Sequence, residues 1–437
     1  MRIALDTPFL KDGIRSTNFF NGRLLSAEDL SREQAARDAA QERLGRALGE
    51  GVAYGLEVGL SLDNSPSTPL VTVQPGLALT RDGEALELLQ PVEVSLLQGA
   101  VEGAASAPEG SGDFGACSLP GSTYVSGTGI YVLVMAPASG REGRAVASGL
   151  GGVQSGCDAK QVVAGVCFRL LRLDQDAALT SALASSALTL RNLVAHQCFG
   201  TTDPDASSVV TWPFSEPTGG YGLLDALRPR FLTPCDVPLA LVHWKDGTGI
   251  RFIDMWAARR RVARVGHPLP WLAGPGDRRE VEAEAMYLQF QEHIERLRVD
   301  AVNPGTVRAT DHFMYLPAAG ILPLGGYTGT RGFDYLKFFE GLTVRAPINI
   351  EGARLPSLLS AARAYPPIEL ARKELIWLYV VRENQQALSA LSGPKPQPYL
   401  VFATGHIPYW GDPRFDTSKW SYANYASGGP SADQPGP

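Results

Sequence analysis

The side chains that could do chemistry are spread thinly along this sequence of 437 residues. Its six histidines are His196, His243, His267, His293, His312 and His406. No two of them lie three or four residues apart, the spacing that would put two metal ligands on one face of a helix. His293 follows Glu292 and His312 follows Asp311, but neither pair creates a ligand spacing. We therefore expect no metal site and no cofactor.

Motifs for catalysis are also missing. The chain has no Gly-Lys dipeptide for a P-loop, no G-x-S-x-G and no H-E-x-x-H. A carboxylate pair for glycoside hydrolysis is defined by distance in the fold, so the sequence leaves it open. Asp254, between Phe252 and Trp256, is the first acid to test, and its alternative is a turn or edge carboxylate. The sequence predicts a protein that is not an enzyme.

One G-x-G-x-x-G occurs, at Gly110, Gly112 and Gly115. Dinucleotide binding requires a strand before this motif and a helix after it. Here a glycine-rich stretch precedes it, and Cys117 and Pro120 follow without a helical pattern. We interpret the match as loop composition.

The basic cluster consists of Arg259, Arg260, Arg261 and Arg264. The whole chain has a net charge of −6, and no aromatic pattern for base stacking accompanies the arginines. We expect no nucleic acid partner. A solvated face, or a contact with an acidic protein partner, is the better interpretation.

The five cysteines are Cys117, Cys157, Cys167, Cys198 and Cys235. None forms a C-x-x-C pair, so we expect no zinc and interpret them as free, buried thiols. A disulfide in the middle of the chain stays open if the protein ends up outside the cell.

Residues 1–20 lack the apolar run of a signal peptide, and no stretch approaches the roughly 20 apolar residues that span a bilayer. The sequence predicts synthesis in the cytoplasm and no direct membrane insertion.

Composition predicts an α+β, β-rich fold. Hydrophobic residues make up 44% and charged residues 19%, which is typical of a globular chain, and 47 glycines and 32 prolines indicate many turns. We expect a docking helix and small β unit over 1–100 and a β-rich middle domain with Gly/Ser-rich loops over 101–268. A mixed α/β domain over 269–426 and a disordered tail over 427–437 follow.

An N-terminal surface helix is predicted over residues 30–48. Ser26 can cap it and accept from the Asp29 amide, and glycines at 49 and 51 end it. Its thin apolar stripe comprises Ala36, Ala40, Leu44, Ala47 and Leu48. A helix this polar lies on a surface, where alanines permit close approach of a neighbour.

Strands and hairpins follow this helix. Asp82-Gly83 between two apolar runs predicts one antiparallel hairpin, and the runs 239–244 and 250–255 predict another. Residues 130–136 predict a buried strand, residues 101–129 a long glycine-rich loop, and residues 280–298 an amphipathic helix.

The opening residues resemble proteins encoded with phage-tail-like contractile injection systems. Those proteins share an aromatic-N-G-[RQ]-x-L-x-A-x-D-[LF] opening followed by a G-x-x-x-G-L-x-V strand. The matching residues are Phe20, Asn21, Gly22, Arg23, Leu25, Ala27, Asp29 and Leu30, then Gly51, Gly55, Leu56 and Val58. The similarity covers most of residues 16–100, with islands to about residue 405. The helix end departs from the family, which often has a more aromatic and histidine-rich sequence there.

The resemblance implies a non-enzymatic structural subunit, a cap adaptor or baseplate accessory at one end of the tube and sheath. Its partners would be tube, sheath, baseplate or cap proteins and further copies of itself, in a particle that can be released from the cell. The expected interaction residues are Phe20, Asn21, Arg23, Ala36, Ala40 and Leu44.

Two other functions stay open. One is a particle-borne fibre or spike that binds a receptor or carbohydrate, which exposed tryptophans such as Trp410 and Trp420 would favour. The missing heptads and fibrous repeats argue against a long fibre. The other is a particle-associated hydrolase, which the motifs support least.

Overall fold

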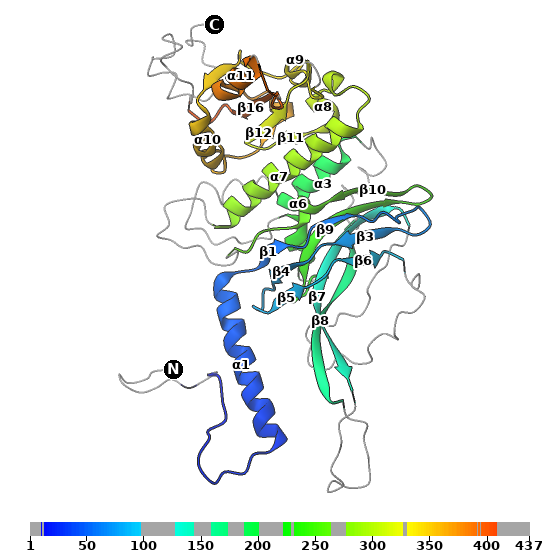
Figure 1. Ribbon diagram of the computed structural model, residues 1–437, viewed down its shortest axis with the longest axis vertical. Helices are drawn as coiled ribbons and strands as arrows, with labels where there is room; N and C mark the ends of the chain where they lie inside the picture. The colour runs from blue at the N-terminus through cyan, green and yellow to red at the C-terminus, as the bar shows by residue number, and fades with distance from the viewer. Residues whose placement is uncertain are drawn as a thin grey trace, which may run out of the picture.

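The computed structural model is an α+β fold rich in antiparallel strands, as the sequence predicts (Figure 1). It describes residues 10, 13–97, 127–143, 159–173, 188–200, 222–228, 231–263, 277–326, 330–390, 392–393 and 395–408. Four predicted features lie outside these residues: the G-x-G-x-x-G motif, nearly all of the 101–129 loop, the domain boundary between residues 268 and 269, and the tail over 427–437.

The N-terminal part joins one long helix to two small sheets. Its elements are α1 (Ala27–Leu48), β1 (Gly51–Gly55), β2 (Val58–Leu60), β3 (Leu70–Val73), β4 (Gly76–Leu79), β5 (Ala85–Leu88) and β6 (Val92–Ser95). The strands pair antiparallel in the orders β1-β4-β5 and β2-β3-β6. The predicted Asp82-Gly83 turn connects β4 to β5, with Gly83 at a φ of 89°.

The middle of the molecule is a four-stranded antiparallel sheet with helices on one face. Its elements are β7 (Gly129–Glu142), β8 (Gln161–Arg172), α3 (Leu190–Phe199), α5 (Leu223–Leu227), β9 (Val237–Lys245), β10 (Gly249–Asp254) and α6 (Met255–Ala258). The strand order is β10-β9-β7-β8. The predicted hairpin is confirmed as β9 and β10, which begin to pair at Lys245 and Gly249.

The first nine residues of β7, 129–137, are buried on both faces of the sheet, which explains the apolar sequence of this part of the strand. Successive side chains of a strand point to opposite faces. Tyr131, Leu133 and Met135 pack into one apolar cluster with residues of the two N-terminal sheets. Ile130 and Val132 pack into another with residues of α3, α6 and α7. The chain therefore forms a layer of small sheets, a central sheet and a layer of helices.

The C-terminal part is a second four-stranded sheet, β12-β16-β15-β13, and the helices around it. Its helices are α7 (Asp277–Asp300), α8 (Ala309–His312), α9 (Tyr335–Phe338), α10 (Leu355–Ala362) and α11 (Arg382–Ser389), with the 3-10 turns η2 (Pro304–Thr306), η3 (Gly352–Arg354) and η4 (Leu370–Arg372). Its strands are β11 (Tyr315–Leu316), β12 (Ala319–Pro323), β13 (Ile348–Ile350), β14 (Ile368–Glu369), β15 (Ile376–Val381) and β16 (Tyr399–Thr404).

Helix α7 connects the two halves of the core. The amphipathic helix predicted over 280–298 forms, and it extends to both sides of that range. Ala285 and Met286 belong to the cluster against the central sheet, whereas Phe290 and Ile294 belong to the cluster of the C-terminal sheet. One helix thus contributes to both apolar clusters.

A buried ion pair lies where the helices meet. The Asp254 carboxylate is fully buried and accepts from Arg191 Nε at 2.7 Å, from Gln289 Nε2 at 2.9 Å and from the Ala257 amide at 3.1 Å. The Arg191 guanidinium also pairs with Glu292 at 3.2 Å. Burial alone lowers the pKa of Arg191, but Asp254 and Glu292 outweigh it, and the net shift is upward. These contacts link α3, α6 and α7.

We expect Arg191→Met to destabilise the fold by about 3–5 kcal/mol, because it leaves the Asp254 charge buried with neutral partners only. Urea denaturation measures this. Lys337→Met serves as control, since the exposed Lys337–Glu340 pair should contribute about 0–1 kcal/mol. Equal small losses in both variants would contradict a structural role for the buried pair.

Candidate functional site

The family-like opening forms a tight turn that is tied to the first turn of α1. The Arg23 amide donates to the Phe20 carbonyl, and Gly22 has a φ of 91°, a conformation that favours glycine. The Arg23 guanidinium donates to Asp29 at 2.5 Å and to the Asn18 carbonyl at 2.6 Å. Arg23 therefore fixes the turn onto the helix.

The start of α1 is capped as predicted. The Ser26 side chain accepts from the Asp29 amide, and the Asp29 carboxylate accepts from the Ser26 amide, which completes a capping box. Hydrogen bonds from Ser26 and the charge of Arg23 lower the pKa of Asp29. The Thr17 amide donates to the Glu33 carboxylate, and the Thr17 hydroxyl donates to the Asp29 carbonyl. The segment before α1 therefore runs back along the first turns of the helix.

The far end of α1 sits on the β4–β5 turn through two glycines. A Cβ added to Gly45 would lie 2.0 Å from the Gly83 carbonyl oxygen, and one added to Gly83 would lie 2.0 Å from the Glu42 carbonyl oxygen. Glycine inside a helix normally costs roughly 0.5–1 kcal/mol relative to alanine. Here its missing side chain lets the helix and the turn touch backbone to backbone.

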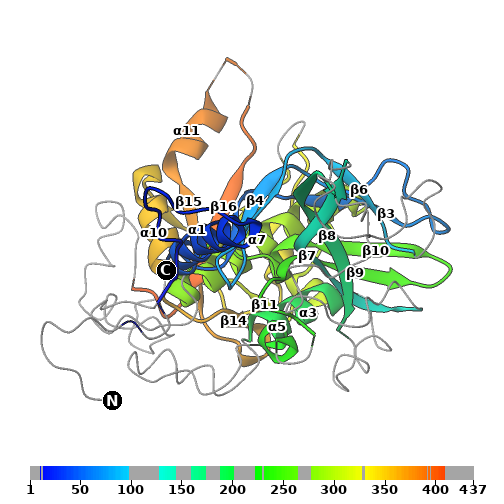
Figure 2. The same cartoon turned by 90° about the horizontal axis from the view of Figure 1, so that it is seen from below.

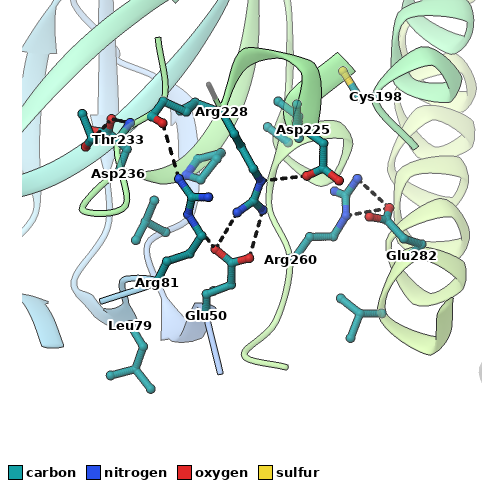
Figure 3. Close-up of a pocket in the computed structure, with 17 residues that line it drawn as sticks. Glu50, Leu79, Arg81, Cys198, Asp225, Arg228, Thr233, Asp236, Arg260 and Glu282 are labelled. Atoms are coloured by element: carbon teal, nitrogen blue, oxygen red, sulfur yellow. Dashed lines mark hydrogen bonds and ion pairs between the residues drawn. The ribbon is translucent and has the colours of Figure 1, made fainter. Parts of the chain in front are cut away.

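Charges next to this contact hold the base of α1 (Figure 3). Glu50, just beyond the helix, accepts from Arg228 at 2.9 and 3.0 Å and lies 3.7 Å from Arg81. Arg228 also donates to Asp225 at 2.7 Å. These residues line a cavity of about 60 Å³. Because the charges compensate one another, we interpret this cavity as structural.

Exposed apolar side chains gather on the N-terminal element, residues 10–48, whose helix projects from the body (Figure 1). They are Leu10, Ile14, Phe19, Phe20, Leu24, Leu25, Leu30, Leu44 and Leu48. Leu24 is 93% exposed and Phe20 63% exposed. Their own chain leaves most of their surface uncovered, so this element is the candidate docking surface.

The six predicted interaction residues do not share one environment. Phe20, Asn21, Ala40 and Leu44 are exposed. Ala36 is buried, on the half of α1 to which the preceding segment returns, and Arg23 is half-buried in its pair with Asp29. Phe19, Leu24 and the other exposed leucines of this element are not among the six, because sequence alone does not say which apolar side chains the fold leaves uncovered.

A second projecting feature is the long ribbon made by β7 and β8. The two strands pair without interruption from Tyr131↔Arg172 to Glu142↔Gln161, so β7 continues well beyond the predicted 130–136. The first five residues of β8 are exposed, Val162 and Val163 among them. Figures 1 and 2 show this ribbon and α1 extending from the same side of the body.

The residues singled out for chemistry are buried or separated. Asp254 ends the edge strand β10, which fits the predicted edge carboxylate, but it is fully buried as the N-cap of α6 and is held by Arg191 and Gln289. His293 is also buried, with a pKa well below its usual value because of desolvation and nearby Arg191. Within the described parts of the chain, His, Cys, Asp and Glu form no group of three that could hold a metal ion.

The cysteines differ from the prediction of free thiols. Cys235 is disulfide-bonded. Cys117 and Cys157 are outside the described residues. Cys167 and Cys198 are free. Burial raises the pKa of the Cys198 thiol to about 12. The prediction failed for Cys235 because spacing along the chain does not reveal which cysteines meet in space.

Comparison with known proteins does not identify a family. No protein-family model matches the sequence, and no curated protein does. In the portions of the chain that the structure describes, every helix is too short or too polar to cross a lipid bilayer.

We expect Gly45→Ala to destabilise the protein by about 1–3 kcal/mol, because the new methyl group would overlap the Gly83 carbonyl. Helix propensity alone predicts the opposite sign, a gain of up to about 1 kcal/mol. Thermal and urea denaturation measure the change. Gly59→Ala is the matched control, since a Cβ there meets no atom within 4 Å. A stabilised Gly45→Ala protein would rule out the close contact.

Acid should destabilise the fold through His196, whose pKa burial lowers to about 3. The unfolded state binds a proton near pH 6.5 and the folded state does not, so stability falls as pH drops below 6.5. Between pH 7 and pH 5 this amounts to about 2 kcal/mol for one such group. His196→Phe keeps a ring against Tyr315 but binds no proton. Between pH 7 and pH 5 its free energy of unfolding should therefore fall by about 2 kcal/mol less than that of the wild-type protein. Identical pH dependence in both proteins would contradict the assignment.

Proposed function

We propose that this protein is a non-enzymatic structural subunit of a contractile, phage-tail-like injection particle. It docks at one end of the tube and sheath, as a cap adaptor or a baseplate accessory. The observation that carries the proposal is the set of exposed apolar side chains on the N-terminal element, whose helix projects from the body.

The geometry of that element suits a contact with another subunit. Helix α1 has 22 residues, a length of about 33 Å at 1.5 Å per residue. Interfaces of standard size bury about 800 Å² per partner, which needs an extended surface of this kind. Each exposed leucine that becomes fully buried would contribute about 1.5–3 kcal/mol.

The anchoring of the element supports the same conclusion. Arg23 holds the opening turn at one end of the helix, and the Gly45–Gly83 contact and the Glu50 charges hold the other end. A docking element that is already ordered loses less conformational entropy when it binds. Among the residues that resemble the injection-system proteins, Gly22, Arg23 and Asp29 build the turn that holds the first end of the helix.

The partners on this proposal are tube, sheath, baseplate or cap proteins and further copies of the chain. Release of the particle from the cell fits the disulfide at Cys235, because disulfides persist in oxidising surroundings. Trp410 and Trp420, which would support a carbohydrate-binding fibre or spike, are outside the described residues. No observation on the described residues favours that function or a hydrolase over docking.

Particles purified by sedimentation from the producing cells test the proposal. We expect the wild-type chain to sediment with them and Phe20→Ser/Leu24→Ser to lower its amount at least tenfold, because both side chains lose apolar contact area. Both residues are exposed, so the free energy of unfolding should change by no more than about 0.5 kcal/mol each.

Leu62→Ser, at an exposed leucine between β2 and β3, is the matched control and should leave incorporation unchanged. Wild-type protein that never sediments with the particles would contradict the particle role. Normal incorporation of the double variant would contradict the docking surface.

A further inference from the structure

Arg259 is a buried cation without an acidic partner in the described structure. It follows α6 and is only 8% exposed. Its guanidinium contacts the Met255 sulfur at 3.5 Å and lies 5.3 Å from the centre of the Trp256 ring. Its neighbours differ: Arg260 pairs with Glu282 at 2.7 Å and Arg261 with Glu284 at 2.8 Å. Of the three, Arg259 alone forms no ion pair among the described residues, and Glu57 acts on its charge without a direct contact.

A buried guanidinium without an ion pair is unfavourable. Burial lowers the pKa of Arg259, and only the charge of the exposed Glu57 acts in the opposite direction. An arginine does not escape the cost by losing its proton, because its pKa remains far above neutrality. Buried charges in proteins are normally paired, so an unpaired one calls for a ligand that completes it.

Arg259 lines a cavity of about 170 Å³. Val281, Leu288 and Trp256 contribute apolar lining, and Arg260 and Arg261 also line it. Glu284 is the acid among the described lining residues, and Arg261 already neutralises it. For scale, an engineered apolar cavity of roughly 150 Å³ binds benzene. The space therefore fits a ring-sized apolar group next to one anionic group.

We propose that this cavity is a binding site for a carboxylate on a short apolar or aromatic stem. The planar guanidinium can donate two parallel hydrogen bonds to the two oxygens of one carboxylate. Arg260 and Arg261 also line the cavity but already pair with Glu282 and Glu284, so Arg259 alone is left to match one negative charge. A phosphate dianion would bring a second charge without a cation to match it. The carboxylate can belong to a small organic acid or to the end of a polypeptide chain. This inference is independent of the particle role.

Isothermal titration of the full chain tests the site with four probes: 3-phenylpropanoate, its amide, inorganic phosphate, and the peptide acetyl-Ala-Ala-Phe with a free C-terminus. We expect 3-phenylpropanoate to bind at least tenfold more tightly than the amide and than phosphate. Binding of the peptide as well would assign the site to chain termini, and binding of 3-phenylpropanoate alone to small acids. Equal binding of acid and amide, or preference for phosphate, would overturn the proposal.

Variants show whether Arg259 is responsible. Arg259→Met should weaken 3-phenylpropanoate binding at least tenfold while melting at or above the wild-type temperature, because it removes an unpaired buried charge. Arg251→Met removes one charge from an exposed position on β10 and should leave binding within twofold. If Arg259→Met melts well below wild type and no probe binds the wild-type protein, the guanidinium is paired within the fold and the site does not exist.

Discussion

The structure depends on one buried ion pair, Arg191 with Asp254, at the junction of three helices. Two charges removed from water are tolerated only if their remaining hydrogen-bonding groups are satisfied, and Gln289, Glu292 and the amide of residue 257 satisfy them. The pair fixes how α3 and α7 lie on the central sheet. Helix α7 also contributes Phe290 and Ile294 to the apolar cluster of the C-terminal sheet. The ion pair on α7 therefore helps to link the central sheet to the C-terminal sheet.

The body held in this way carries two projecting features, α1 and the β7–β8 ribbon. Different interactions attach the two features to the body. Two glycines and a group of compensated charges anchor the helix, whereas an unbroken ladder of paired residues extends the ribbon out of the central sheet. Both leave apolar side chains in water that the body does not cover. A structural subunit would need such surfaces, whereas Asp254 and His293, which were considered for chemistry, are buried in the core.

Local signals in the sequence predicted the local structure well. Ser26 and Asp29 marked the start of α1, and Asp82-Gly83 marked a hairpin, because a cap or a turn involves neighbouring residues. The buried partners of Asp254 were not predictable, since Arg191 is 63 positions away. The same holds for Gly45 against Gly83, for the disulfide at Cys235 and for the burial of Ala36. Each depends on which distant segments meet, and no spacing encodes that.

The most direct test of the docking account is an electron cryomicroscopy reconstruction of the intact particle with this chain placed in the density. The account predicts the chain at one end of the tube and sheath, with Phe20, Leu24 and the exposed side of α1 covered by a neighbouring subunit. A reconstruction in which α1 points into solvent, or in which the particle contains no density for this chain, would contradict it.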